Sequence, residues 1–319
     1  MPFWRFLLLF GSFLLAAGIT GCESGNDFGS PHTAGPATSP RYDLYVCSSI
    51  GTSGPNGQTY RSGIYGTFYG REEQFEEIVN LDGVDSLIDS CAVDDHGNLY
   101  WTDRGKHGIF KADPNGANPR QIVFNLDIPF GLAIDETHQR LYWTNWLQQD
   151  HPQTGQIGYT DLDGNNPVVI IDSLRSGGDL LIDQTRKKLY ISDLFGGKIL
   201  QTDLDGSDLT TLVTANRPEQ LALDTEEGIL YWADIADDAL YRVHLDGTGK
   251  APVLTFGDDF ANPSVLARNG TRLLFNVRAT VNGNTTEVLR SYDLLSHQLQ
   301  TVSTHLPFAI KKIILKQHD

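Results

Sequence analysis

A five-residue motif occurs four times in the middle of this chain and constrains its fold more than any other feature. The motif is Leu-Tyr-Trp-Thr-Asp or a close variant, and its tyrosines are Tyr100, Tyr142, Tyr190 and Tyr231. The steps between these tyrosines are therefore 42, 48 and 41 residues. Repeats of this length are supersecondary units that bury their apolar faces by stacking on their neighbours. We therefore expect an array of similar units.

Each repeat contains three further apolar segments beside the motif, and all four segments alternate between apolar and polar side chains. They are rich in β-branched and aromatic residues, which is typical of half-buried strands. The segment after the motif ends in Asn-Gly or Asp-Gly, and both pairs favour a tight hairpin. These segments are 109–116, 157–164, 199–206 and 240–247. Four antiparallel strands in each repeat predict the blades of a β-propeller.

The two ends of the repeated region complete the count of blades. Segments 44–48, 62–70 and 75–80 predict three strands of a first blade. Its missing innermost strand is predicted at 308–315, so that the C-terminus closes the ring. Four more segments predict a sixth blade, and they are 264–268, 273–276, 288–292 and 299–302. The predicted fold class is an all-β, six-bladed β-propeller of four-stranded antiparallel blades, closed by the C-terminal strand.

The first 41 residues differ in composition from the repeated region. Residues 1–21 contain one early Arg and a long apolar run, which predicts a secretory signal peptide. Residues 22–41 are rich in Gly, Ser, Pro and Thr and predict a flexible tether. The propeller is then expected at 42–319, with about 46 residues for each of six blades.

The apolar run ends at Ile19-Thr20-Gly21-Cys22, an apolar residue, two small residues and a cysteine. This order resembles the cleavage site of bacterial lipoproteins, in which the cysteine becomes the N-terminus and carries lipid. The resemblance implies that Cys22 anchors the chain stably to a membrane. It also implies a cell-envelope location that faces the periplasm or the cell surface, with the outer membrane favoured because residue 23 is Glu. The alternative is an ordinary cleaved signal with a chance cysteine.

The repeats resemble the low-density-lipoprotein-receptor class B repeat, whose signature is Tyr-Trp-Thr-Asp. The resemblance is strong in blades two to five and implies a six-bladed YWTD propeller. Asn145 and Ile191 depart from the signature. Those receptors flank the propeller with cysteine-rich modules, whereas this chain has three cysteines. Binding of lipoprotein particles is therefore not implied.

Residues that recur once in each blade are expected to serve the blades themselves. The tryptophans are interpreted as wedges between blades, because they bury a large area. The aspartates are interpreted as acceptors for backbone N–H groups across turns. The residues with this expected structural role are Tyr100, Trp101, Asp103, Tyr142, Trp143, Tyr190, Asp193, Tyr231, Trp232 and Asp234.

The charge and the motifs of the chain exclude several classes of function. Lys and Arg number 24 against 40 Asp and Glu, which gives a net charge of −16. A protein that binds nucleic acid needs a basic face, so no nucleic-acid partner is expected. The nine histidines form no His-x-His or His-Glu-x-x-His spacing, and no Gly-x-Ser-x-Gly turn occurs. We expect no catalytic residue, no metal and no cofactor, and a binding protein rather than an enzyme.

Two cysteines, Cys47 and Cys91, are predicted on adjacent blades. An exported chain meets oxidising conditions, under which two such cysteines form a disulfide if their geometry allows it. The sequence leaves open whether they are bonded or are two buried free thiols.

The binding residues are expected on the face that carries two sets of loops. One set joins strands two and three of a blade, and the other joins strand four to the next blade. Three loops of the first set are predicted to be long, at 49–62, 146–154 and 279–287. Exposed aromatic and polar residues suit a contact patch, although ordinary solvated loops are the alternative. The candidates are Trp146, Asp150, His151, Arg175, Phe195, Arg217, Glu219 and Phe130.

These patterns predict a membrane-anchored binding or scaffold lipoprotein whose loop face binds a protein or a glycan. The alternative is a calcium-dependent lactonase or esterase of the gluconolactonase type, which also uses six blades. That class needs carboxylate and amide oxygens that converge on a divalent metal at the axis. Asp179, Asn216 and Glu219 are residues of the required kinds.

Overall fold

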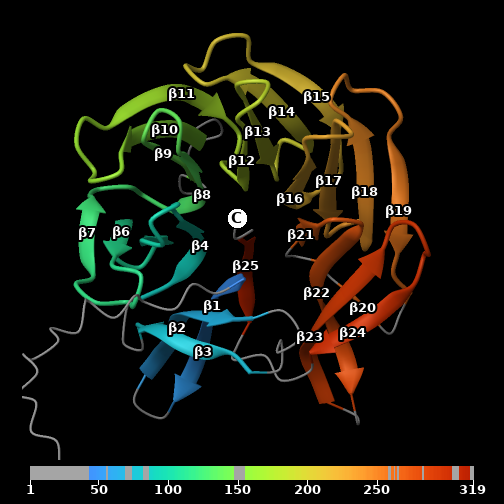
Figure 1. Ribbon diagram of the computed structural model, residues 1–319, viewed down its shortest axis with the longest axis horizontal. Coiled ribbons are helices and arrows are strands. Elements are labelled where there is room, and N and C mark those ends of the chain that lie inside the picture. The colour runs from blue at the N-terminus through green and yellow to red at the C-terminus, as the bar shows by residue number, and fades with distance from the viewer. Residues whose placement is uncertain are drawn as a thin grey trace, which may run out of the picture. The chain divides into compact units, whose positions relative to one another are not determined.

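Six antiparallel sheets surround a common axis, and each sheet is one blade of a propeller (Figure 1). The computed structural model describes residues 43–54, 57–68, 74–81, 86–146, 155–257, 260–261, 263, 266–281, 284–303 and 309–316. In these residues every regular element is a strand, and no helix reaches the length and hydropathy of a membrane span. The innermost strands of successive blades contact one another around the ring. The predicted fold class is confirmed.

Blades two to five each contain four strands in chain order, from the inner strand to the outer strand. Blade two contains β4 (Ile88–Val93), β5 (Leu99–Asp103), β6 (Gly108–Ala112) and β7 (Arg120–Val123). Blade three contains β8 (Pro129–Asp135), β9 (Arg140–Asn145), β10 (Gly155–Asp161) and β11 (Val168–Leu174). Blade four contains β12 (Leu180–Asp183), β13 (Lys188–Asp193), β14 (Lys198–Asp203) and β15 (Thr210–Thr214). Blade five contains β16 (Pro218–Asp224), β17 (Ile229–Asp234), β18 (Ala239–His244) and β19 (Ala251–Thr255).

The first and last blades close the ring. Blade one has the order β25-β1-β2-β3, so its inner strand is the C-terminal strand β25 (Ile310–Leu315). The other three are β1 (Leu44–Gly54), β2 (Gly57–Thr67) and β3 (Glu76–Asn80). Blade six contains β20 (Phe260–Ala261), β21 (Leu266–Asn269), β22 (Arg272–Val281), β23 (Asn284–Asp293) and β24 (Leu299–Ser303). Both β20 and β21 pair with β22, so the inner edge of this blade is divided into two pieces.

Two of the three predicted long loops are wrong, because their residues continue the flanking strands. Ser49 pairs with Ser62, and the register runs on to Gly54 opposite Gly57. In blade six, Ala279 pairs with Thr286 and the hairpin extends beyond them. Both segments are rich in Thr, Asn and Gly, which are common in loops, and composition alone did not distinguish these paired strands from loops. Of the third segment, only Trp146 lies within the described residues.

The repeated Asp-Gly turns pack each blade against the preceding one. Gly164 has a φ of +87°, which favours glycine. A Cβ atom built at this position would lie 2.0 Å from the backbone oxygen of Ile122 in the outer strand of blade two. A Cβ atom built at Gly116 would lie at the same distance from the backbone oxygen of Ile78 in blade one. The glycine of the repeat is therefore required by backbone conformation and also by the close approach of neighbouring blades.

The core consists of apolar layers between blades rather than one central core. Trp101 is fully buried in a layer that also contains Tyr45 of blade one. Trp143 packs with residues of blade two, and Trp232 packs with residues of blade four. Large apolar side chains that are removed from water at each interface hold the flat blades together. The repeat therefore stabilises the ring chiefly through contacts between its successive copies.

Candidate functional site

The last residue of each Tyr-Trp-Thr-Asp motif holds a loop between blades. The backbone N–H of Leu87 donates to Asp103 at 3.0 Å, and the N–H of Ser176 donates to Asp193 at 2.9 Å. In blade three, Asn145 accepts from the N–H of Ile128 at 3.0 Å. An amide oxygen accepts a hydrogen bond as a carboxylate oxygen does. The replacement of Asp by Asn145 in the motif therefore keeps the hydrogen bond to the inter-blade loop. These bonds fix the inter-blade loops, which are half of the loop face.

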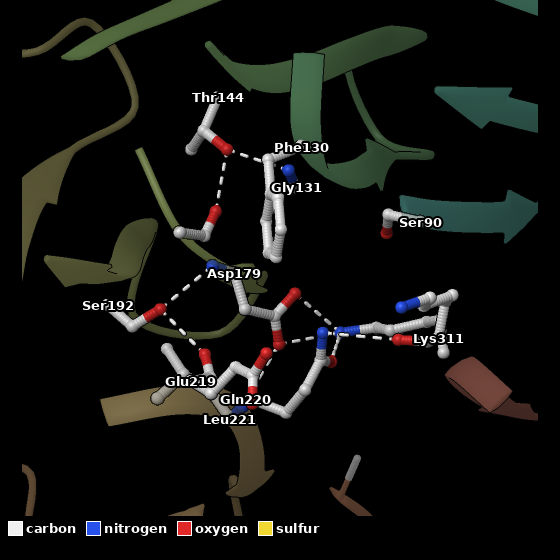
Figure 2. A network of polar contacts seen from close by, with 12 residues as sticks. Ser90, Phe130, Gly131, Thr144, Asp179, Ser192, Glu219, Gln220, Leu221 and Lys311 are labelled. Atoms are coloured by element: carbon white, nitrogen blue, oxygen red, sulfur yellow. Dashed lines mark hydrogen bonds and ion pairs between the residues drawn. The ribbon is translucent and has the colours of Figure 1, made fainter. Parts of the chain in front are cut away.

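The Thr or Ser that precedes the last residue of the motif links the inner strands of consecutive blades. In blade three, the N–H of Gly131 donates to the hydroxyl of Thr144 at 2.7 Å, and that hydroxyl donates to the carbonyl of Gly178 at 2.6 Å. In blade four, the hydroxyl of Ser192 donates to the carbonyl of Glu219 at 2.7 Å (Figure 2). Sequence reasoning did not single out these hydroxyls, although their recurrence as Thr or Ser was a usable signal. They hold the inner strands in register at the mouth of the axis.

A buried ion pair crosses the axis. The ammonium of Lys312 in β25 donates to both carboxylate oxygens of Asp179 at 2.6 Å. It also donates to the side-chain oxygen of Gln220 in β16 at 3.0 Å, and the N–H of Leu221 donates to Asp179 at 3.0 Å. Asp179 is fully buried, and Lys312 is 6% exposed. The charges are matched and hydrogen-bonded, as burial requires.

Among the described residues, two of the three candidate metal ligands of the enzymatic alternative engage other side chains. Both oxygens of Asp179 accept from Lys312, while the amide of Asn216 donates to Asp237 at 3.0 Å. Within the described part of the chain, no group of three or more His, Cys, Asp or Glu side chains is placed to hold a metal ion.

Glu219 lies beside this ion pair and is partly buried. Burial raises the pKa of its carboxyl group to about 7, and the cations Lys311 and Arg217 oppose that shift. The negative charges of Asp89 and Asp179 favour the protonated acid further. The protonated acid is therefore more populated at neutral pH than it is for a carboxyl group in water.

Aromatic and cationic side chains from three blades meet on the loop face. The ring of Trp146, which follows β9, lies 5.0 Å from the ring of Phe195, centroid to centroid. The guanidinium carbon of Arg217 lies 5.9 Å from the centroid of the Phe195 ring, within the range of a cation–π contact. Phe195 is 43% exposed. We call Trp146, Phe195 and Arg217 the aromatic patch.

An apolar pocket adjoins the aromatic patch. Three predicted binding residues line it, and they are Phe130, Trp146 and Glu219. In Figure 2 the ring of Phe130 points toward Asp179. The remaining lining residues were missed by sequence reasoning, because they carry no unusual side chain, and they are Ser176, Gly177, Gly178, Leu194 and Pro218.

Five of the eight predicted binding residues thus meet around one pocket and the patch beside it. Arg175 is exposed next to Ser176 but is not among the lining residues. Asp150 and His151 lie outside the described residues, as do residues 1–42 with Cys22.

The fold and the repeat define this chain as a six-bladed β-propeller built from YWTD-type repeats. The pattern of the low-density lipoprotein receptor repeat class B matches residues 97–136. This stretch starts at the turn before β5 and ends just after β8. Each sequence repeat is therefore offset by one strand from a blade, which is the same offset that lets β25 complete blade one.

The chain is also similar to named animal proteins. Protein cueball of the fruit fly Drosophila yakuba is 32% identical over 188 residues, which cover 54% of this chain and 29% of the relative. Protein cueball of Drosophila erecta is 34% identical over 145 residues, which cover 43% of this chain and 22% of the relative. The chain therefore covers less than a third of the length of these curated relatives.

A solved structure shares the fold. The crystal structure of a nidogen/laminin complex contains a chain that matches with a TM-score of 0.66 and 19% identity. The match covers 85% of this chain and 96% of that chain. At this identity the likeness concerns the fold alone.

These comparisons do not support the interpretation as a bacterial lipoprotein. The relatives named above are fruit-fly proteins, and their similarity extends over 54% and 43% of the chain. The lipoprotein resemblance rested on four residues that end at Cys22. A pattern this short arises readily in a signal sequence, where small residues precede the cleavage site.

Proposed function

We propose that this propeller binds a protein partner on its loop face, with the aromatic patch as the centre of contact. The observation that carries the proposal is the meeting of Trp146, Phe195 and Arg217 from three different blades. An exposed phenylalanine and a half-buried tryptophan beside an arginine have the composition of interface hot spots. The cavity beside them has a volume of about 10 Å³, which is about the size of one water molecule, so the contact rests on the patch itself.

Two further observations support a protein partner. The hydrogen bonds that Asp193 and Asn145 accept from backbone N–H groups hold the loops that carry the patch, so little conformational entropy is lost on binding. The similar propeller in the nidogen/laminin complex shows that this fold is compatible with a protein complex. A glycan partner is the less favoured form of the same proposal, since the patch presents one cation and an apolar pocket.

The test is capture of purified laminin, and of a secreted-protein fraction, on the immobilised full chain. Phe195→Ala and Trp146→Ala should weaken the capture of the same protein by about 30-fold or more, as hot-spot truncation does. Phe124→Ala is the matched control, because this phenylalanine is 61% exposed and lies outside the patch. Equal capture by all variants, or capture of glycans alone, would contradict the proposal.

The location of the chain is a separate proposal that rests on residues outside the described part. The apolar run before Cys22 supports export, and Cys22 supports attachment to a membrane through lipid. Metabolic labelling with a fatty acid, read on the full chain and on Cys22→Ser, tests the attachment. Label that persists in the variant, or is absent from both proteins, would contradict it.

A further inference from the structure

The two cysteines of the described chain meet at the interface between blades one and two. Cys47 lies in β1 and is fully buried, and Cys91 lies in β4 and is 2% exposed. Both belong to one apolar layer together with Tyr45 and Trp101. Their side chains are in hydrogen-bond contact with each other, and both are free thiols in this structure. Two strands from different blades therefore present their sulfur atoms to each other.

The position of this pair matters because blade one is where the ring closes. Its inner strand β25 comes from the other end of the chain and is joined to β1 by hydrogen bonds and apolar packing, with no covalent link, and Leu44 lies opposite Leu315 and Val46 opposite Ile313. A bond between Cys47 and Cys91 would not cross that junction. It would instead fasten β1 to the inner strand of blade two, and β25 contacts both of these strands.

We propose that Cys47 and Cys91 form a disulfide that fastens blade one to blade two and keeps the docking edge for β25 in place. The bond would close a loop of 45 residues, counted from position 47 to position 91 with both cysteines included. Loop closure removes conformations of the unfolded chain in which β1 is separated from β4. The C-terminal strand β25 then pairs with a β1 strand that is already held next to β4.

The chemistry is a thiol–disulfide exchange with an oxidised dithiol protein of the export pathway. One cysteine thiolate attacks the disulfide of the donor and forms a mixed disulfide with it. The second thiolate attacks the sulfur of that mixed bond, and the donor leaves as a dithiol. Two protons leave the cysteines, and two electrons pass to the donor, so the exchange balances.

The surroundings of the pair determine when this exchange takes place. Burial and the neighbouring thiol raise the pKa of Cys47 well above its ordinary value, against the opposing charge of Lys312. The thiolate, which is the reactive form, is therefore scarce in the closed ring. The bond forms while blade one is still open, and it is protected from reductants once the ring has closed.

The test is a peptide map of the full chain after expression through an oxidising export route. The protein is unfolded and alkylated without a reductant, and a second sample is reduced before alkylation. We expect a linked pair of peptides with Cys47 and Cys91 in the first sample and both cysteines alkylated in the second. Alkylation of both in the unreduced sample, or a link from either to Cys22, would overturn the proposal.

A second measurement separates the bond from simple packing of two thiols. Thermal unfolding is followed with and without reductant present during the heating. The melting temperature of the oxidised protein should fall by several degrees in reductant, while that of Cys47→Ala/Cys91→Ala should not move. Alanine is the preferred replacement because a serine hydroxyl would be buried without a partner. Equal response of both proteins to reductant would overturn the proposal.

Discussion

The ammonium of Lys312 lies 2.6 Å from both carboxylate oxygens of Asp179, so the C-terminal strand is tied to blade four across the axis. The two residues are 133 positions apart in the chain. Lys312 belongs to the strand that closes the ring, and Asp179 directly precedes the inner strand β12. The ion pair therefore forms only when the closing strand β25 is in place, and it links ring closure to blade four.

Lys312→Met should destabilise the ring strongly, because it leaves Asp179 as a buried carboxylate without a countercharge. We expect a loss of about 3–5 kcal/mol in the free energy of unfolding, measured with urea. Adding Asp179→Asn to this variant should recover part of the loss, since the buried charge is then gone.

The matched control for this prediction is Lys316→Ala. Lys316 pairs with Asp95 at 3.2 Å, but Asp95 is 69% exposed. A surface pair of this kind contributes less than about 1 kcal/mol. Equal losses of unfolding free energy in the two variants would show that the axial ion pair stabilises the ring no more than a surface pair does.

Gly164→Ala should lower the free energy of unfolding by more than the strain of a positive φ alone explains. The new methyl group would overlap the carbonyl oxygen of Ile122, 2.0 Å away. Gly270→Ala is the control, because Gly270 also has a positive φ and meets no atom within 4 Å. We expect about 1 kcal/mol for Gly270→Ala and at least about 2–3 kcal/mol for Gly164→Ala, read from thermal or urea unfolding.

Asp193 should tolerate asparagine but not alanine. One of its oxygens accepts from the N–H of Ser176 at 2.9 Å and from the N–H of Gly196 at 3.0 Å. Asparagine keeps that oxygen, as Asn145 does in blade three. Alanine leaves the donors unpaired, which costs about 2 kcal/mol in the free energy of unfolding.

Asp193→Ala should also weaken partner capture. The hydroxyl of Ser176 donates to Asp193 at 3.0 Å and accepts from the N–H of Phe195 at 3.0 Å. Loss of the carboxylate therefore loosens the support of the aromatic patch. Unchanged capture by a folded Asp193→Ala protein would show that this support is dispensable.

Glu219→Gln should stabilise the protein at pH 8. The pKa of Glu219 is raised from 4.5 to about 7, because the fold disfavours its ionised form. The folded state therefore binds more protons than the unfolded state between these values, and stability falls as pH rises through that window. Above pH 7 the penalty is complete and amounts to about 1–3 kcal/mol, with allowance for partial exposure.

The measurement is the difference in unfolding free energy between the natural protein and Glu219→Gln at several pH values. The variant should be the more stable at pH 8, and the difference should shrink as the pH falls from 7 toward 4.5. A difference that does not vary with pH would assign the effect to packing rather than to ionisation.

Much of the architecture could be predicted from short stretches of sequence. Strand alternation and the Asp-Gly turn at Gly164 depend on residues that are neighbours in the chain, and they sufficed for six blades and for closure by the C-terminal strand. The hairpin between Ser49 and Ser62 escaped prediction, because whether polar residues pair or form a loop depends on the strand opposite.

The candidate site could be predicted only in part. Exposed aromatic residues in predicted loops pointed to Trp146 and Phe195, but the sequence contains no information on their 5.0 Å contact. Asp179 suggested a metal ligand, and the structure pairs it with Lys312 instead. Both outcomes depend on which loops and strands the ring brings together.

The sequence by itself determined the repeated strand, the turn and the interblade tryptophan, because each follows from local backbone preference and from the apolar pattern of one repeat. Only the tertiary structure decided that Lys312 meets Asp179, that Cys47 meets Cys91 and that three blades share one aromatic patch. The physical reason is that six stacked blades must close into a ring, and closure brings together residues that no local pattern connects.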